Sequence, residues 1–505
     1  MSGAPPSFPS ASPRIVVVGT GPAGVRAAQA LVRGGVRPIV VDESRRDGGQ
    51  IYRRQPEGFK RPYAKLYGTE AEKAQALHSD FDALRDHIDY RGDTLAWNVS
   101  EGALHVVHAG EPQTLPFDAL LVCSGATDRL MPVAGWHRAG CYSLGASQIA
   151  LKAQACAIGS RVVFMGSGPL LYLVASQYVQ AGARVAAVLD TAPAAKPWGA
   201  VAGLLARPRL ALRGLALIRG LRRAGVPVLQ GVEPLRIDGD DSLGVQAVAV
   251  RDAQGREQRF ECDAVGLGWH LRAETQLADI ARCDFEFEPL SRQWLPRIDA
   301  DGRSSTKGVY LAGDGVRILG ADGAEAAGRL AALAALADLG HAPGRALYDA
   351  ESAALRRTLA QMNRFREGLA RAFPWPHAQA AALPDDAVVC RCEAVTAGEL
   401  RRCVNEMDSH EVNRAKAFSR VGMGRCQGRF CGHASAEIVA QASGVPVQLV
   451  GRLRQERENA VEEAAQARRE AALLADEVKT LQAERKQVRS RIEKLLGQID
   501  QLSAS

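Results

Sequence analysis

The stretch RIVVVGTGPAGVRAAQALVRGGVRPIVVD, residues 14–42, decides the fold. It reads as a buried apolar strand, a Gly-x-Gly-x-x-Gly turn, an amphipathic helix and a second buried strand. In such a unit Gly19 makes the tight turn, Gly21 lets backbone amides approach a pyrophosphate, and Gly24 lets the helix press on the sheet. Asp42 ends the second strand, where a carboxylate can bind a ribose hydroxyl. The sequence therefore predicts a Rossmann unit that binds a dinucleotide; a βαβ unit with incidental glycines is the alternative.

A second unit of the same kind begins at Arg161 and ends at Asp190. Its turn contains Gly166 and Gly168, but Leu171 stands where the third glycine belongs. A leucine there changes how the helix packs on the strand and can alter or close the pyrophosphate pocket. Two interpretations stay open, a second nucleotide site at Gly166 and Gly168 or a Rossmann remnant with a structural role.

Two further apolar runs end in small-residue turns. FDALLV at 117–122 leads into Cys123-Ser-Gly125, and GVYLAGDG at 308–315 delivers Asp314 at a strand end just before a Gly/Ala-rich helix. A carboxylate in that position can hydrogen-bond a polyol, and a helix N-terminus can face an electron-rich ring system. We therefore expect one nucleotide site built from two halves, with the second Rossmann unit inserted between them.

These patterns resemble the flavoprotein superfamily with two dinucleotide-binding domains, which includes thioredoxin reductase and amine dehydrogenases, over about residues 14–340. The resemblance implies an α/β fold with two Rossmann-like domains and a bound FAD. The cofactor-binding residues that it implies are Gly19, Gly21, Pro22, Ala23, Gly24, Asp42, Glu43, Gly49, Gln50, Gly125, Gly313 and Asp314. The disulfide reductases of the superfamily need a cysteine pair beside the flavin. This chain has no cysteine before Cys123, so disulfide reductase activity is disfavoured.

Four cysteines form two close pairs: Cys390 and Cys392 in a C-x-C, and Cys426 and Cys431 in a C-x4-C. Glycines at 422, 424, 428 and 432 surround the second pair and leave room for backbone amides near sulfur. Iron–sulfur clusters use four thiolates tuned by such amides, whereas structural zinc sites usually space each pair by two to four residues. The pattern predicts a [2Fe-2S] cluster; zinc and buried thiols are the alternatives, and Cys403 is expected to be a packing residue.

GMGRCQGRFC, at 422–431, resembles the bacterioferritin-associated-ferredoxin type of [2Fe-2S] domain, although that type usually closes with C-x-x-C. A flavoprotein fused to such a domain is similar to the alpha (A) subunits of opine oxidases and of hydroxyproline and proline dehydrogenases, and to the B subunit of hydrogen cyanide synthase. GGQIYRRQP at 48–56, the GSGPLL turn and GRLR at 451–454 fit this family. The similarity spans about residues 14–454.

This resemblance implies a function in electron transfer. A second flavoprotein (beta) subunit would oxidise the C–N bond of an amino acid or opine, and this chain would pass the electrons to a downstream acceptor. The implied cofactors are FAD and a [2Fe-2S] cluster; FMN at a subunit interface and NAD(P) or another nucleotide at the second Rossmann site are left open. The alternatives are a self-contained NAD(P)H-dependent flavin reductase of the ferredoxin-reductase type and a coiled-coil scaffold with a vestigial flavoprotein body. No catalytic residue is singled out, since the histidines are scattered.

Composition and charge limit which partners and which cellular location the sequence predicts. A net charge of +7 on 505 residues is too dilute to predict a nucleic-acid partner, and ten cysteines are too few for a disulfide scaffold, which favours the cytoplasm. No apolar run predicts a membrane span. For the basic segment 204–225, a solvated helix is favoured over a helix that lies on a membrane surface. Peripheral association of the protein with a membrane through its electron acceptor stays open.

Heptads from Ala464 to Leu502 predict a coiled coil that could form a homo-oligomer; a long helix folded back on the body is the alternative. The expected organisation then has seven segments. They are a disordered lead (1–13), the FAD domain in two parts (14–135 and 263–340), the inserted Rossmann domain (136–262), a helical connector (341–383), the [2Fe-2S] domain (384–450) and the coiled coil (455–505).

Overall fold

The structure is a computed structural model that describes residues 13–240 and 242–453. The predicted coiled coil at 455–505 and all but the last residue of the predicted lead at 1–13 lie outside the described residues.

The first sheet has five parallel strands in the order β20-β7-β1-β2-β3. The side chains of β1 and β7 are almost completely buried, as expected for strands covered on both faces. The strand bounds are β1 Ile15–Val18, β2 Ile39–Val41, β3 Asp89–Arg91, β7 Ala119–Val122 and β20 Val309–Leu311.

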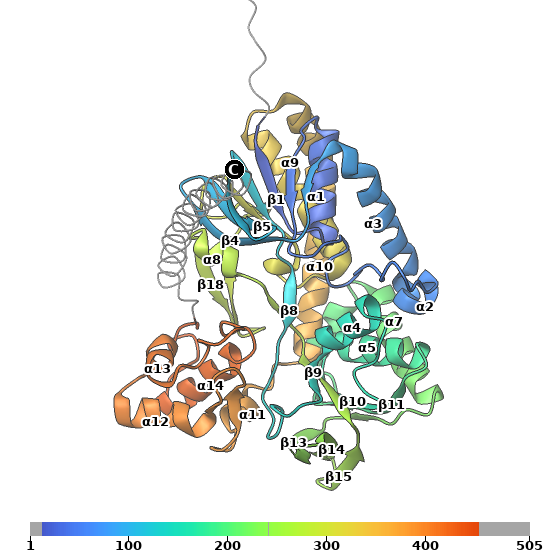
Figure 1. Ribbon diagram of the computed structural model, residues 1–505, viewed down its shortest axis with the longest axis vertical. Helices are drawn as coiled ribbons and strands as arrows, with labels where there is room; N and C mark the ends of the chain where they lie inside the picture. The colour runs from blue at the N-terminus through green and yellow to red at the C-terminus, as the bar shows by residue number, and fades with distance from the viewer. Residues whose placement is uncertain (1–12, 241, 454–505) are drawn as a thin grey trace, which may run out of the picture. The chain divides into compact units, whose positions relative to one another are not determined.

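The first sheet is assembled from two distant parts of the chain. β20 pairs with β7 in parallel register, although the whole second sheet lies between them in sequence. The helix after β20, α9 (Gly320–Asp338), lies beside α1 (Pro22–Arg33), the helix after the first glycine turn (Figure 1). Gly328 of α9 allows this approach, because a side chain there would collide with the backbone of Ala23.

Smaller elements complete this part of the chain. An antiparallel meander follows β3, and helices α2 and α3 follow the loop after β2. The bounds are α2 Tyr63–Tyr67, α3 Ala71–Leu84, β4 Thr94–Ser100, β5 Ala103–His108 and β6 Glu111–Pro116, with short 3-10 turns at Gly68–Glu70, Arg85–His87 and Gly313–Gly315.

The second sheet is also parallel, with five strands in the order β12-β11-β10-β16-β9. It has its own helices and a three-stranded antiparallel flap, β13-β14-β15. The strands are β9 Cys141–Ser143, β10 Arg161–Ser167, β11 Arg184–Asp190, β12 Val228–Gln230, β13 Glu233–Asp240, β14 Gly244–Arg251, β15 Glu257–Glu261 and β16 Ala264–Trp269; the helices are α4 Leu144–Ala153, α5 Pro169–Gln180, α6 Trp198–Leu204 and α7 Pro208–Arg223. The fold therefore has the two Rossmann-like sheets that the sequence predicts.

The basic segment 204–225 contains α7, which packs on α5 through Leu217, Ile218 and Leu221. Leu212 and Leu215 of the same helix are exposed. No helix in the described ranges has the length and apolar character needed to cross a lipid bilayer.

A short antiparallel ribbon joins the two sheets. β8 (Ala126–Asp128) leaves the first sheet, and β17 (Leu271–Ala273) returns from the second; the two pair with each other. α8 (Gln276–Ile280) and the hairpin of β18 (Phe285–Glu288) and β19 (Gln293–Pro296) follow β17.

The C-terminal described part is small and mostly helical. The long helix α10 (Ala342–Ala372) leads into it, and a two-stranded ribbon and four helices follow. Their bounds are α11 His377–Ala381, β21 Val388–Cys390, β22 Val395–Thr396, α12 Ala397–Met407, α13 Val412–Ser419 and α14 Gly432–Ser443. Thr396 and Glu399 form a reciprocal capping box at the start of α12.

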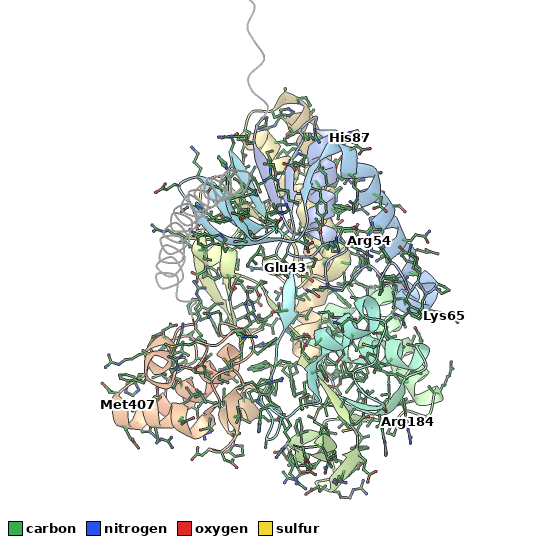
Figure 2. All side chains as sticks on the ribbon, in the orientation of Figure 1. Glu43, Arg54, Lys65, His87, Arg184 and Met407 are labelled. Atoms are coloured by element: carbon green, nitrogen blue, oxygen red, sulfur yellow. The ribbon has the colours of Figure 1, made fainter. Side chains whose placement is uncertain are left out.

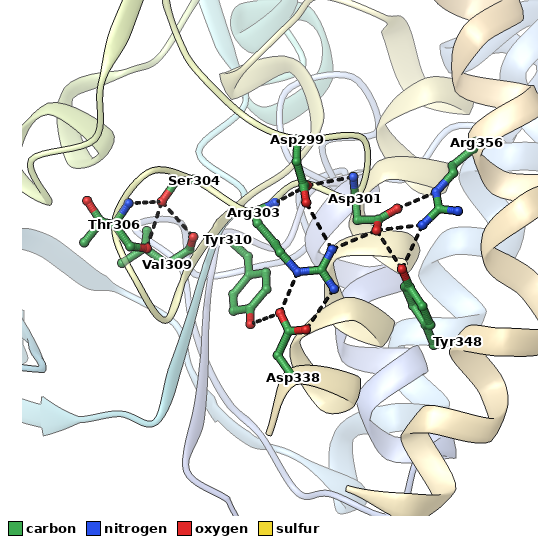
Figure 3. A network of polar contacts seen from close by, with 10 residues as sticks. All are labelled: Asp299, Asp301, Arg303, Ser304, Thr306, Val309, Tyr310, Asp338, Tyr348 and Arg356. Carbon is green, nitrogen blue, oxygen red and sulfur yellow. Dashed lines mark hydrogen bonds and ion pairs between the residues drawn. The ribbon is translucent and has the colours of Figure 1, made fainter. Parts of the chain in front are cut away.

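A buried carboxylate ties α9 and α10 to the loop before β20 (Figure 3). Asp301 accepts two hydrogen bonds from Arg356 at 2.7 Å, one from Tyr348 at 2.7 Å and one from Arg303 at 2.8 Å. Burial opposes ionisation of Asp301, but these donors lower its pKa to about 2. Arg303 also bonds Asp338 near the end of α9, at 2.6 Å, so the network fixes the helices that follow β20.

We expect Asp301→Asn to destabilise the protein by about 3 kcal/mol, because it removes the charge from a buried, hydrogen-bonded ion pair. The loss should appear as a lower Tm in thermal unfolding. Asp349→Asn is the matched control: its pair with Arg345 is exposed and should be worth less than about 1 kcal/mol.

The loss of stability in Asp301→Asn should also depend on pH. The pKa of Asp301 in the folded protein lies below the value of about 3.9 in an unfolded chain, so its stabilisation is present above about pH 4 and disappears as the pH falls toward 2. Equal Tm values for the two variants at pH 7 would contradict the role given to Asp301.

Candidate functional site

The first glycine turn packs too tightly for side chains at two of its three glycines. Gly19 has φ +97°, and a side chain there would collide with the carbonyl of Cys123 at the end of β7. A side chain at Gly24 would collide with the carbonyl of Gly19. Gly19 therefore lets the turn lie against the end of β7, and Gly24 lets α1 begin close to the turn.

Gly21 differs, because its side-chain direction is open. It has φ −71°, an ordinary value, and a methyl group there would meet only the Cα of Gly49, at 3.7 Å. Gly49 has φ +59° and belongs to the turn that follows β2. Pro22 and Ala23 then begin α1, and the free amides of a helix start are suited to bind a phosphate. Space beside Gly21 and amides at a helix start fit the pyrophosphate of FAD.

The two carboxylates after β2 have different surroundings. Asp42 is buried; it accepts hydrogen bonds from the amide and hydroxyl of Thr20 at 2.6 Å and from the amide of Ser44 at 2.7 Å. Glu43, labelled in Figure 2, is exposed and forms no hydrogen bond or ion pair with a described residue. Asp42 thus stabilises the glycine turn itself, and Glu43 is the carboxylate that remains available to a ribose. Gln50 is likewise exposed and is held by Arg53 at 2.9 Å.

The second half of the predicted site lies at the ends of β7 and β20. The backbone of Gly313 and Asp314 follows β20, and Asp314 accepts hydrogen bonds from the amides of Leu319 and Gly320 at 2.8 and 3.0 Å. Burial raises the pKa of Asp314 to about 6. A hydroxyl donor such as a ribityl chain would compensate that burial, so this carboxyl fits the proposed ligand.

Gly125 stands at the start of the β8 ribbon, next to this half. It has φ +72°, and no atom lies within 4 Å of the position that its side chain would take. Its neighbour Ser124 donates a hydrogen bond to the carbonyl of Glu274 at 2.6 Å. Gly125, which the sequence assigns to the cofactor, therefore has open space beside it, as Gly21 does.

The four cysteines of the two sequence pairs come together in space. Cys431 lies within interaction range of Cys390 and Cys426, and Cys426 within that of Cys392. Among the described residues, no three Cys, His, Asp or Glu side chains are already arranged as ligands of a single metal ion. Interaction with Cys431 lowers the pKa of Cys390 and of Cys426, and the same interactions raise the pKa of Cys431. Thiols that are this close together and share protons can serve as a set of thiolate ligands for iron.

Backbone amides surround these sulfurs, because glycine keeps the loops close. The amides of Gly422 and Glu393 point at Cys390, and those of Gly428 and Phe430 point at Cys426. Gly422 and Gly428 have φ +78° and +76°, and a side chain at either would collide with Leu453. Amide donors around four thiols fit a [2Fe-2S] cluster.

Cys403 lies apart from this group. It is buried on α12 with Val404, Val412 and Val439 in a separate apolar cluster. This placement is that of a packing residue.

The second glycine turn is filled by the protein itself. The position that a side chain of Gly168 would take lies 3.2 Å from the imidazole of His270, which bonds the carbonyl of Phe373 at 2.8 Å. Burial lowers the pKa of His270 to about 4, so the ring is neutral. A side chain at Gly166 would collide with Gly268 of the neighbouring strand. His270, held by the residue that follows α10, therefore lies directly beside Gly168, so this turn has less open space than the turn at Gly21.

The carboxylate that would bind ribose in this second unit is also engaged. Asp190 is fully buried; it accepts hydrogen bonds from the hydroxyl of Tyr172 at 2.5 Å and from the amide of Ala192 at 2.9 Å. Leu171, in place of the third glycine, is buried in the core between α5 and the sheet.

Three functional candidates escaped the sequence patterns. Arg272, Glu274 and Arg429 connect the ribbon to the loop between Cys426 and Cys431. The available signal was Arg272 between Leu271 and Ala273, directly after the apolar run 264–269, since an arginine in such a setting indicates a buried charge with a specific partner.

Comparison with known proteins agrees with this geometry. Residues 13–330 match the family model described as pyridine nucleotide-disulphide oxidoreductase, and residues 388–441 match the BFD-like [2Fe-2S] binding domain. The chain is 36% identical over 446 residues to the opine oxidase A subunit of Agrobacterium tumefaciens, covering 84% of this chain and 85% of that protein. It is 31% identical over 439 residues to the hydrogen cyanide synthase subunit HcnB of Pseudomonas protegens, covering 85% and 92%.

A solved structure shares the fold. The crystal structure of L-proline dehydrogenase from P. horikoshii has a TM-score of 0.63 to this chain, with 18% identity, and covers 89% of this chain and 79% of that one.

The chain is therefore an FAD-dependent oxidoreductase of the α/β class that carries a [2Fe-2S] domain. Within that class it belongs to the family of the opine oxidase A subunits and the hydrogen cyanide synthase B subunits. The predictions of FAD and of a [2Fe-2S] cluster are confirmed at the level of the family; the individual binding residues remain predictions.

Replacing one cluster cysteine should remove the cluster. We expect Cys426→Ser to lose nearly all iron and sulfide, because an alcohol in place of a thiolate is a poor ligand for this centre. Iron, acid-labile sulfide and the visible spectrum of the purified protein are the measurements. Cys403→Ala is the control and should keep a full complement, since Cys403 only packs in the apolar cluster.

The open position beside Gly21 gives a test of the FAD site. We expect Gly21→Ala to fold normally, because the added methyl meets only one protein atom at ordinary contact distance, yet to lose at least ten-fold in FAD affinity. Flavin content after desalting measures the effect. Gly58→Ala, where a methyl group meets nothing within 4 Å, should bind FAD normally. Normal flavin content in Gly21→Ala would place the pyrophosphate elsewhere.

Proposed function

We propose that this chain is the electron-transfer subunit of an enzyme that oxidises the C–N bond of an amino acid or opine. A partner flavoprotein subunit oxidises the substrate, and this chain passes the electrons to a downstream acceptor. The names of the relatives support the proposal, since those proteins are subunits of opine oxidase and of hydrogen cyanide synthase. When bound, a flavin supplies two-electron chemistry and a [2Fe-2S] cluster carries single electrons.

The candidate flavin half-site and the thiol group are joined through a single residue, and this connection carries the proposal. The amide of Glu274 donates to the carbonyl of Gly125 at 3.0 Å, and its carboxylate accepts from Arg429 at 3.0 Å. Gly125 belongs to the candidate FAD site, and Arg429 lies between Cys426 and Cys431. This chain therefore supplies a fixed connection between two redox groups, and no residue of it is assigned to substrate chemistry.

The alternative of a self-contained NAD(P)H-dependent reductase has less support. His270 and the end of α10 fill the second glycine turn, and Asp190 is bonded inside the protein. A nicotinamide dinucleotide would have to displace both. We infer that the second Rossmann unit has a structural role in this chain.

The partner subunit, FMN at an interface with it and a cytoplasmic location are parts of the same proposal. None of the ten cysteines, which all lie among the described residues, is paired in a disulfide, which fits a reducing compartment. The coiled-coil scaffold alternative depends on residues 455–505, which lie outside the described residues.

The source of electrons separates the two functions. We expect the purified chain with bound FAD to show no flavin bleaching with NADH or NADPH over minutes, because the second turn is closed. Co-expressed with its partner flavoprotein, the complex should reduce both cofactors when given the right amino acid or opine. The visible absorbance of the oxidised flavin and the EPR signal of the reduced cluster report the reaction.

Dithionite serves as the positive control and should reduce both cofactors of the isolated chain. Rapid bleaching by NADH in the absence of a partner would favour the reductase and overturn the proposal.

A further inference from the structure

Arg272 places a positive charge inside the protein beside the cluster loop. It belongs to β17, its guanidinium is buried, and only 9% of the residue is exposed. Its neighbours on the strand, Leu271 and Ala273, pair with β8. A buried arginine is retained where its charge has a partner that compensates the loss of water.

The contacts of Arg272 lead to the loop that carries the second cysteine pair. Its Nη1 donates to the backbone carbonyl of Arg429 at 3.2 Å, and its Nη2 lies 3.7 Å from a carboxylate oxygen of Glu274. Glu274 accepts a hydrogen bond from Arg429 Nε at 3.0 Å. Arg272 and Glu274 are alternate residues that reach the same side, so one of them holds the backbone of Arg429 and the other holds its side chain.

The charges around this contact do not cancel. Arg272 and Arg429 share the single carboxylate of Glu274, so these three residues carry a net charge of +1, and the buried Arg129 lies near enough to Arg272 to add to it. Burial lowers the pKa of Arg272 and Arg429 lowers it further, whereas Glu274 and, to a smaller extent, Cys426 and Cys431 as thiolates raise it and favour the charged form. A four-thiolate [2Fe-2S] cluster is anionic and gains a further negative charge on reduction. The net positive charge at this contact is therefore opposite in sign to the charge of the cluster.

We propose that Arg272 is a positioning residue that sets the reduction potential of the cluster. Its charge stabilises the reduced cluster more than the oxidised one, and its hydrogen bond to Arg429 fixes the C-x4-C loop against the ribbon that begins at the candidate flavin site. This inference deepens the proposed electron-transfer function and rests on it, but it concerns an equilibrium of the cluster that needs neither substrate nor partner.

The test is an EPR-monitored potentiometric titration of the full chain with its cluster, using dithionite as reductant. In Arg272→Gln an amide remains as a donor toward Arg429, but the charge is gone. We expect the ratio of reduced to oxidised cluster at a given potential to fall at least ten-fold, which is a shift of about 59 mV to lower potential for a one-electron couple. Arg272→Lys keeps the charge and should stay close to the wild-type potential.

Arg452→Gln is the matched control. Arg452 bonds Asp279 at 2.5 Å and joins the C-terminal described part to the same region after β17. Among the described residues its side chain makes no hydrogen bond or ion pair with the cysteine loop. Its removal should leave the potential unchanged. An equal shift in this variant would attribute the effect to a loosened contact between the two parts and overturn the proposal.

The remaining outcomes are also decisive. An unchanged potential in a folded, cluster-containing Arg272→Gln overturns the proposal, as does loss of the cluster from both Arg272 variants, which would show a merely structural role. Loss of the cluster from Arg272→Gln alone, with Arg272→Lys retaining it at a normal potential, supports the need for charge. None of these results depends on whether an amino acid or NADH is the electron source.

Discussion

The pairing of β8 with β17 is the contact on which the arrangement of the redox groups depends. The chain leaves the first sheet at β8 and returns to it after β17, and the two strands are hydrogen-bonded to each other along three residue pairs. One end of the ribbon holds Gly125 and Ser124 at the candidate flavin half-site, and the other end holds Arg129, whose buried guanidinium lies over Trp375, 3.9 Å from the ring centre. Because β8 and β17 are paired, the cysteine loop that contacts β17 is also held at a fixed position relative to Gly125.

The small cluster domain shares its interior with the second Rossmann unit. A single apolar core contains Trp136 and Trp269 from one part and Val389 and Ile438 from the other. Trp136 donates to the carbonyl of Val388 at 2.5 Å, immediately before the first cysteine pair. Burial of shared apolar area makes the two parts one packing unit, which suits a carrier of single electrons, since a mobile domain would vary the distance to its donor.

The two glycine turns show how one motif can acquire different roles. At the first, the side-chain position of Gly21 is open and the buried Asp42 braces Thr20, so space remains for a ligand. At the second, the imidazole of His270 lies beside the side-chain position of Gly168, and the neutral ring bonds the backbone carbonyl of Phe373. The second Rossmann unit also supplies part of the apolar core against which the cluster domain packs.

Local patterns in the sequence were enough to predict the fold class, the two-part first sheet and the [2Fe-2S] cluster, because strand–turn–helix periodicity and cysteine spacing are short-range features. FAD and the family were implied by the resemblance to known proteins that these patterns carry. They could not predict whether Gly168 faces a ligand or His270, nor that Asp42 turns inward and leaves Glu43 exposed, since these depend on segments distant in sequence or on side-chain direction. The contact between Arg272 and Arg429 likewise exists only in the folded chain. The partner of a buried charge can lie far away in the sequence, so the spacing of residues within one segment does not reveal which residue it is.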